Sequence, residues 1–214
     1  MFVGGGAFHP NINSSLGALG SAEFFANFYL HIAHHGAWEL IHGMILAGPV
    51  LWLVGVGAFW NDRSDWSRTA MTAMTLASTV WAVAFVFDGF VAPNIVRWVP
   101  AGVGHYLLMV NQNAVIRLGL VSWLLLGFSM ITGSVGTLVS SRRKSARVLA
   151  WLGILLGVWP FLAWATGIFL PGPFTSPYWN VSAVSVAFWF LAVGVLLLVS
   201  VPTQNRAEAV GGAP

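Results

Sequence analysis

The stretch LGLVSWLLLGFSMITGSVGTLVS, residues 118–140, decides the fold class. A helix needs about 20 predominantly apolar residues to cross the hydrocarbon core of a bilayer, and this stretch supplies them without a charge. Comparable apolar stretches recur along the chain. The expected transmembrane helices cover about residues 40–60, 69–92, 117–140, 148–170 and 181–201.

The composition of the whole chain agrees with a membrane protein. Of its 214 residues, 57% are hydrophobic and only 7% are charged, whereas soluble globular proteins carry about 25% charged residues. Apolar and polar residues do not alternate with a period of two, so a β-barrel is not expected. We predict an all-α integral membrane helical bundle of about five transmembrane helices, with an extended outer first helix. Residues 21–201 should form a single bundle.

Several classes of site and partner are excluded by residue content. The chain has no cysteine, which excludes thiolate metal ligands, iron–sulfur clusters and covalently attached c-type haem. Its basic residues are too few for a nucleic-acid surface. The lipid bilayer is the expected partner, and other membrane subunits are an alternative.

The segments outside the spans are polar or rich in turn-forming residues. Residues 1–20 lack a basic n-region and a cleavage site, so we expect an outer lead-in rather than a signal peptide. Residues 93–104 and 171–180 contain several prolines and are expected to be loops. Residues 202–214 should form a disordered cytoplasmic tail.

The distribution of basic residues predicts the orientation. Cytoplasmic loops of membrane proteins carry an excess of Lys and Arg. With five spans, one side of the membrane receives seven of the nine basic residues, which are Arg63, Arg68, Arg142, Arg143, Lys144, Arg147 and Arg206. We therefore predict a bacterial inner (plasma) membrane protein with its N-terminus outside and its C-terminus in the cytoplasm.

The sequence HIAHHGAWELIH, residues 31–42, is the most unusual segment, because it holds four of the six histidines. A helix from residue 21 to residue 60 would be about 60 Å long, twice the thickness of the ~30 Å hydrocarbon core. It must therefore project from the membrane, lie along its surface, or break at Gly36.

Helical geometry divides these side chains into two sub-sites. At 100° per residue, His31, His35, Glu39 and His42 fall within one stripe, and His34 lies to its other side. His31 and His42 would be ~16 Å apart along the axis, too far to share one ion. His31 with His35, and Glu39 with His42, have spacings that place them together.

Other titratable residues are expected at the same membrane face. Asp88 lies near the end of the second span, where an unpaired carboxylate costs about 2.5–3.5 kcal/mol at the bilayer centre and less near the interface. It should pair with Arg117 or a histidine, be protonated, or face water before Pro93. His105 and Arg117 lie at the outer part of the third span.

Histidine and carboxylate side chains are the ligands of many transition metals, and a histidine pair can hold a b-type haem. The leading hypothesis is therefore a metal- or haem-binding membrane protein, with redox activity as an option. The cofactor-binding candidates are His42 and His105. The metal-ligand candidates are His31, His34, His35, Glu39 and His42.

Two further hypotheses follow from the same residues. In the second, the protein is a cofactor-free enzyme that performs acid–base chemistry on a lipid or isoprenoid, with Glu39 and Asp88 as catalytic candidates. In the third, it is a non-catalytic subunit of a membrane complex. The structural alternative is an interfacial polar face in contact with headgroups and water.

The order of three short patterns loosely resembles uncharacterised small bacterial polytopic membrane proteins. These patterns are Phe8-His9-Pro10, Trp38-x-x-x-His42, and a span that ends in Asp88 and Ala92-Pro93. In such proteins another apolar helix precedes the His-Pro, whereas here only MFVGGGA does. The resemblance implies the fold and no activity.

Overall fold

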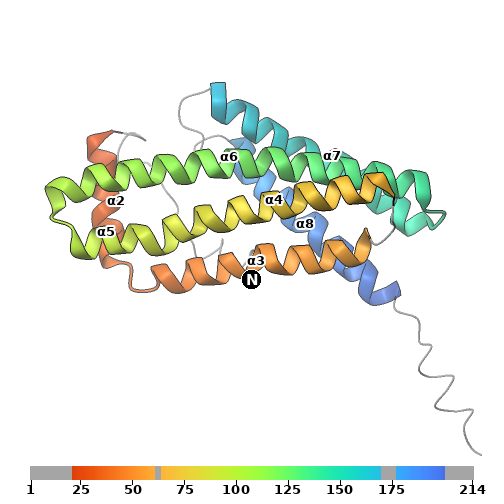
Figure 1. Ribbon diagram of the computed structural model, residues 1–214, viewed down its shortest axis with the longest axis horizontal. Helices are drawn as coiled ribbons and strands as arrows, with labels where there is room; N and C mark the ends of the chain where they lie inside the picture. The colour runs from red at the N-terminus through yellow and green to blue at the C-terminus, as the bar shows by residue number, and fades with distance from the viewer. Residues whose placement is uncertain (1–20, 61–63, 170–176, 201–214) are drawn as a thin grey trace, which may run out of the picture.

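A computed structural model describes residues 21–60, 64–169 and 177–200, and all regular secondary structure in them is helical (Figure 1). This confirms the predicted all-α class. The predictions for residues 1–20 and 202–214 lie outside the described residues. The elements are α2 (Ala22–His34), α3 (Trp38–Phe59), α4 (Asp65–Val86), the π-helix η2 (Phe87–Val91), α5 (Ala92–Trp98), α6 (Ala101–Ser140), α7 (Lys144–Phe169) and α8 (Pro177–Ser200).

Five of the helices are long and apolar enough to cross a membrane, as the sequence predicted. In the second of them α4, η2 and α5 follow one another without a loop. The five candidate spans are Trp38–Phe59, Asp65–Trp98, Ala101–Ser140, Lys144–Ile168 and Val181–Val199.

Helix α6 runs through the centre of the bundle, with α4 and α7 packed against it (Figure 1). Helix α8 packs on α7 and α3, and α3 packs on α4. Buried serines hold α6 to α4, because Ser122 Oγ and Ser129 Oγ donate to main-chain carbonyls of α4 at 2.9 and 2.7 Å. Such small polar contacts replace the hydrophobic effect as a source of helix association in lipid.

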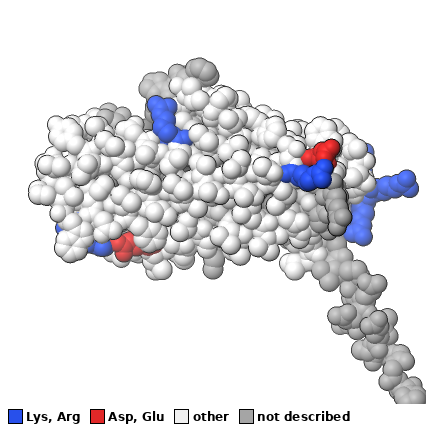
Figure 2. All heavy atoms as spheres, in the orientation of Figure 1, with Lys and Arg blue, Asp and Glu red and all other residues white. Residues whose placement is uncertain are grey.

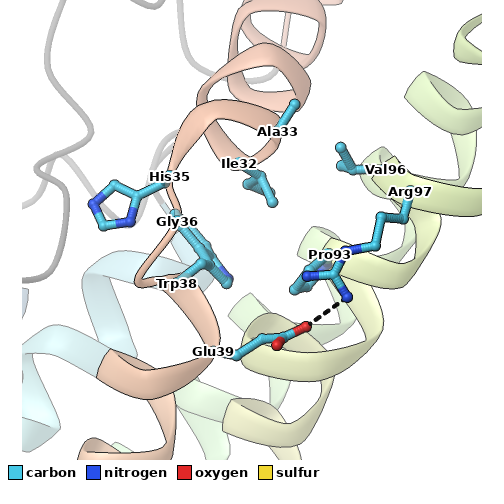
Figure 3. A pocket seen from close by; sticks show the side chains of 9 residues that line it. All are labelled: Ile32, Ala33, His35, Gly36, Trp38, Glu39, Pro93, Val96 and Arg97. Carbon is cyan, nitrogen blue, oxygen red and sulfur yellow. Dashed lines mark ion pairs between the residues drawn. The ribbon is translucent and has the colours of Figure 1, made fainter.

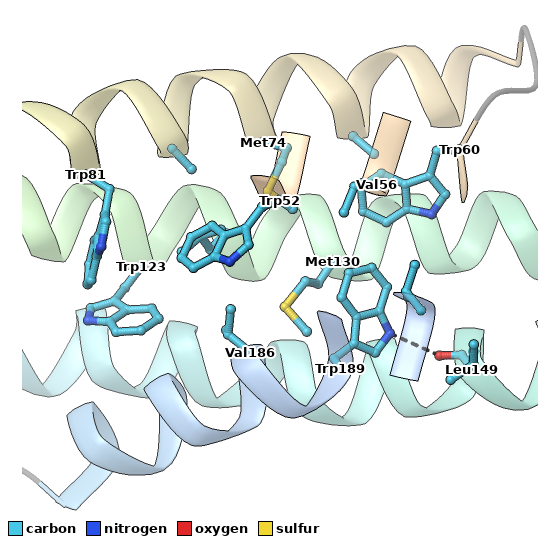
Figure 4. Close-up of a cluster of buried hydrophobic side chains, with 14 of the residues drawn as sticks. Trp52, Val56, Trp60, Met74, Trp81, Trp123, Met130, Leu149, Val186 and Trp189 are labelled. Carbon is cyan, nitrogen blue, oxygen red and sulfur yellow. Dashed lines mark hydrogen bonds between the residues drawn. The ribbon is translucent and has the colours of Figure 1, made fainter. Parts of the chain in front are cut away.

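Large apolar side chains fill a buried core between the helices (Figure 4). Trp123, Trp189, Met74 and Met130 are fully buried there. The indole N–H of Trp189 donates to the Leu149 carbonyl at 3.2 Å. This core is apolar, so the polar groups of functional interest must lie elsewhere.

The histidine-rich segment breaks between α2 and α3, at residues 35–37. Of the three expected outcomes, the break at Gly36 is therefore correct. Helix α2 lies across one end of the bundle against α5 and α6 (Figure 1). It buries Phe24, Phe28 and Ile32 in a small second core. We refer to this end as the α2 end.

Two predicted loops are partly wrong. Within residues 93–104 only Val99 and Pro100 lie outside helices, because Pro93 lies near the start of α5, which continues η2 without a loop. Residues 177–180 begin α8 instead of ending a loop. Residues 105–140, which could have been one helix or two, belong to the single helix α6.

Most charged side chains lie toward the ends of the bundle, and one basic side chain lies on the face between them (Figure 2). Of the seven Lys and Arg residues in the described ranges, five lie at the end opposite α2, namely Arg68, Arg142, Arg143, Lys144 and Arg147. The α2 end carries Arg97 beside Glu39. The two ends of the bundle therefore differ strongly in charge.

Candidate functional site at the α2 end

A buried ion pair joins α3 to the π-helix. His42 Nε2 lies 3.1 Å from Asp88 Oδ2, with His42 fully buried and Asp88 8% exposed. This confirms that Asp88 pairs with a histidine and does not face water. Arg117, the other expected partner, is exposed on α6.

Donors from three other residues converge on the Asp88 segment. Gln112 Nε2 on α6 donates to Asp88 Oδ1 at 2.8 Å. The indole N–H of Trp38 donates to the Asp88 main-chain oxygen at 2.8 Å, and Asn111 Nδ2 donates to the Phe87 main-chain oxygen at 3.1 Å. Each oxygen of the Asp88 carboxylate therefore has a hydrogen-bond partner, Gln112 at Oδ1 and His42 at Oδ2.

The π-helix explains how these contacts are possible. In η2 a backbone N–H donates to the carbonyl five residues earlier in the chain, as the Ala92 N–H does to the Phe87 carbonyl. A π-bulge widens the helix and is frequently found at functional sites. Gly89 then lets α3 approach, because a Cβ at this position would lie 2.3 Å from the Cβ of His42.

The hydrogen bonds determine how many protons the pair holds. His42 Nδ1 lies 2.8 Å from the Trp38 carbonyl, which can only accept, so Nδ1 must carry a proton. The 3.1 Å contact of Nε2 with Asp88 then needs a second proton, on Nε2 or on the carboxyl. The geometry therefore describes a pair that shares one dissociable proton.

Trp38 separates this pair from the other histidines. Its indole is 2% exposed and stacks on the His42 ring, with centroids 4.7 Å apart and planes 25° apart. On other sides it contacts the rings of His31 and His35, at 6.2 and 5.9 Å. Trp38 therefore lies between the His42–Asp88 pair and the pair formed by His31 and His35.

The rings of His31 and His35 lie side by side, with centroids 5.8 Å apart. His35 Nδ1 is buried and makes no hydrogen bond with the described residues. His34 is exposed, and its Nδ1 donates to the Leu30 carbonyl of its own helix at 2.7 Å. His31 and His35 therefore form a pair at the C-terminal end of α2, and His34 is not part of it.

The helical spacing predicted that Glu39 would lie with His42, but the structure keeps the two side chains apart. The Glu39 carboxylate instead lies 3.0 Å from the Arg97 guanidinium on α5, with both side chains about half exposed. The ion pair borders a pocket of about 110 Å³ between the α2–α3 turn and α5 (Figure 3). Trp38 also lines this pocket, while the ring of His35 points away from Arg97.

His105 is also held apart from the buried pair. Its ring contacts Tyr29 edge to face at 4.9 Å, and the Tyr29 hydroxyl donates to the Val96 carbonyl at 2.8 Å. Gln112, the α6 residue that does reach Asp88, is seven residues further on, or about 10 Å along the helix axis. The structure therefore does not bring His105 to His42.

The predicted ligand set is divided among three places. His31 and His35 form one pair, Glu39 pairs with Arg97, and His42 pairs with Asp88. In the described parts of the chain, no three His, Asp or Glu side chains are grouped so that they could hold one metal ion.

Sequence reasoning missed some of the residues that build the site. These residues are Trp38, Gln112 and Arg97, none of which is among the residues predicted to form the site. The Asp88-Gly89 step, a carboxylate beside a residue without a side chain inside a span, was the available signal.

No protein-family model matches the chain, and neither a curated protein nor a solved structure is significantly similar to it. The geometry of the α2 end therefore carries the functional assignment.

Proposed function

We propose that the protein is a membrane enzyme that performs acid–base chemistry on an amphiphilic substrate in the outer leaflet, with Asp88 and His42 as the proton-exchanging pair. The observation that carries the proposal is the 3.1 Å contact between two buried side chains, His42 Nε2 and Asp88 Oδ2. A positioned group of this kind contributes rate by giving or taking a proton at the reacting atom. The charge difference between the ends of the bundle supports the outer leaflet.

Access favours Asp88 as the group that meets the substrate. His42 is fully buried, whereas the Asp88 side chain is 11% exposed. Phe87 and Phe90 flank it on η2 and are both 36% exposed, so an amphiphile can lie against them. A proton would pass from Asp88 to a basic atom of the substrate, and the pair would recover one from another substrate atom or from water.

His42 then acts as the second member of the pair. Its Nδ1–H bond to the Trp38 carbonyl fixes the ring, so that Nε2 faces Asp88 in both proton positions. Glu39 was also a catalytic candidate, but its carboxylate is engaged by Arg97 outside the buried pair. We assign the reaction to Asp88 for this reason.

Isotope labelling tests the proposal without knowledge of the substrate. The purified protein is incubated with membrane lipids in D₂O or in oxygen-labelled water, and the lipids are analysed by mass spectrometry. We expect a lipid that gains label with the native protein and with Asp65→Asn, an exposed carboxylate paired with Arg68, but not with Asp88→Asn. No labelled lipid, or equal labelling by all three proteins, would contradict the proposal.

A second candidate function is transition-metal binding by His31 and His35. Their 5.8 Å centroid separation is compatible with two imidazoles on one ion, since metal–nitrogen bonds are about 2.0–2.1 Å long. The buried Nδ1 of His35, which makes no hydrogen bond within the described residues, supports this candidate. Water would occupy the remaining coordination positions.

The neighbouring His34 provides a matched control for the metal site. Copper(II) binding is measured by electron paramagnetic resonance on the full chain. We expect nitrogen coordination that is lost in His31→Ala and in His35→Ala and retained in His34→Ala. Equal spectra for all three variants would overturn the site.

The arrangement of His42 and His105 does not fit a bis-histidine haem. His42 Nε2 is directed at Asp88 and His105 lies against Tyr29. Both side chains would have to leave their contacts to face one iron.

A further inference from the structure

We propose that the pocket beside Trp38 binds the headgroup of a zwitterionic phospholipid that carries a phosphate and a primary ammonium, with the phosphate on Arg97 and the ammonium on Glu39. This rests on the proposed function in one respect, because it names the class of amphiphile that would lie beside Asp88. The binding itself is independent of any reaction.

The pocket offers two opposite charges in one place. The Arg97 guanidinium and the Glu39 carboxylate are 3.0 Å apart and about half exposed, on α5 and α3 (Figure 3). An ion pair at this exposure contributes little stability, so a ligand that replaces it with two new ion pairs meets little resistance. Guanidinium is well suited to a phosphate, because it donates parallel hydrogen bonds to two oxygens.

Charge complementarity favours a zwitterion over an anion. A purely anionic headgroup at Arg97 would lie beside the Glu39 carboxylate, which repels it, whereas a zwitterion places its ammonium there. A primary ammonium has donors for that carboxylate, and a quaternary ammonium has none. The rest of the lining includes the apolar residues Ile32, Pro93 and Val96, which suit the adjoining glycerol and chain segments.

The pocket and the buried pair share one wall. Trp38 lines the pocket, stacks on His42 and donates to the Asp88 main-chain oxygen. A headgroup in the pocket would therefore place its acyl chains near η2, whose Phe87 and Phe90 face outward. Tryptophan is also the residue enriched at the headgroup level of membranes.

The test measures lipid retention by the full chain. The protein is taken from bilayers that contain phosphatidylethanolamine, phosphatidylcholine and phosphatidylglycerol in equal amounts, and the retained lipids are counted by native mass spectrometry. We expect an excess of phosphatidylethanolamine of about fivefold or more, which corresponds to a preference of about 1 kcal/mol. The excess should be lost in Arg97→Gln and in Glu39→Gln, and retained in Arg68→Gln, which opens an exposed ion pair at the other end.

Two further measurements distinguish a failure of the lipid site from a failure of the proposed enzyme activity. Asp88→Asn should keep the lipid preference, because Asp88 does not line the pocket. Intact lipid retention together with no labelled lipid from the native protein would count against the enzyme alone. Soluble phosphoethanolamine should not displace the lipid. Equal retention of the three lipids, or retention unaffected by Arg97→Gln, would overturn the site. Displacement by phosphoethanolamine would overturn the lipid as its ligand and assign the pocket to a soluble molecule of the same charge pattern.

Discussion

Gly89 and His42 touch so closely that no larger residue fits at position 89. A Cβ there would lie 2.3 Å from the Cβ of His42 and 2.9 Å from its Cγ. These atoms are next to the backbone of α3 and cannot rotate away. The distance between α3 and η2, and with it the 3.1 Å contact of His42 with Asp88, therefore depends on this glycine.

Gly89→Ala should accordingly destabilise the protein by about 1–3 kcal/mol, the usual cost of overpacking. Gly43→Ala, next to His42 on the same helix, is the control because nothing lies within 4 Å of its added Cβ. It should be neutral or slightly stabilising. Unfolding in detergent, followed by circular dichroism, compares the two variants. Equal stability would show that the contact is not as close as described.

Removal of one member of the His42–Asp88 pair should destabilise the protein strongly, whereas replacement of both members by apolar residues should not. Removal of one member, as in His42→Leu, should cost about 3–5 kcal/mol, because it leaves the Asp88 carboxylate without its histidine. The double variant His42→Leu/Asp88→Leu should recover most of that loss, since apolar residues often replace buried pairs without penalty. Unfolding of both variants under the same conditions tests this. A double variant as unstable as the single one would mean that the pair is structural.

Trp38→Phe separates the hydrogen bond of the indole from its stacking. Phenylalanine keeps an aromatic ring on His42 but loses the donor to the Asp88 carbonyl, so a loss of about 1–3 kcal/mol is expected. Trp98→Phe is the control, because Trp98 is 77% exposed. Thermal denaturation should show a lowered midpoint for Trp38→Phe alone. The same midpoint for both variants would argue against the Trp38 bond.

The Glu39–Arg97 pair should be weak and sensitive to salt. A double-mutant cycle with Glu39→Gln and Arg97→Gln is expected to give a coupling of about 0.2–1 kcal/mol, as for other exposed pairs. The coupling should decrease between low and high salt, because counterions screen exposed charges. A coupling of several kcal/mol would identify the pair as a structural latch instead of an exchangeable binding site.

The sequence was sufficient for the fold class because membrane insertion imposes strong requirements on composition and length. Five apolar stretches therefore correspond to five helices. The continuation of the second span through Pro93 was not predictable from proline content, since proline is equally compatible with a loop and with the first turn of a helix.

The site was predictable in part. Its histidine stretch and Asp88 could be identified, because polar side chains in a span demand partners. Their pairing could not, because helical spacing places His42 near Glu39, whereas in the structure Arg97 of α5 engages Glu39 and Asp88 of η2 engages His42. The π-helix, which turns Asp88 toward His42, leaves no periodic signal in the sequence.

The shared proton between His42 and Asp88 is the central claim, and nitrogen-15 NMR of histidine-labelled protein in bilayers tests it most directly. His42→Leu identifies the His42 signals, and Asp88→Asn is compared with the native chain. We predict that the Nε2 signal moves when Asp88 is replaced, while Nδ1 keeps the shift of a protonated nitrogen bonded to a carbonyl. His42 signals that are identical in the native chain and in Asp88→Asn would contradict the account.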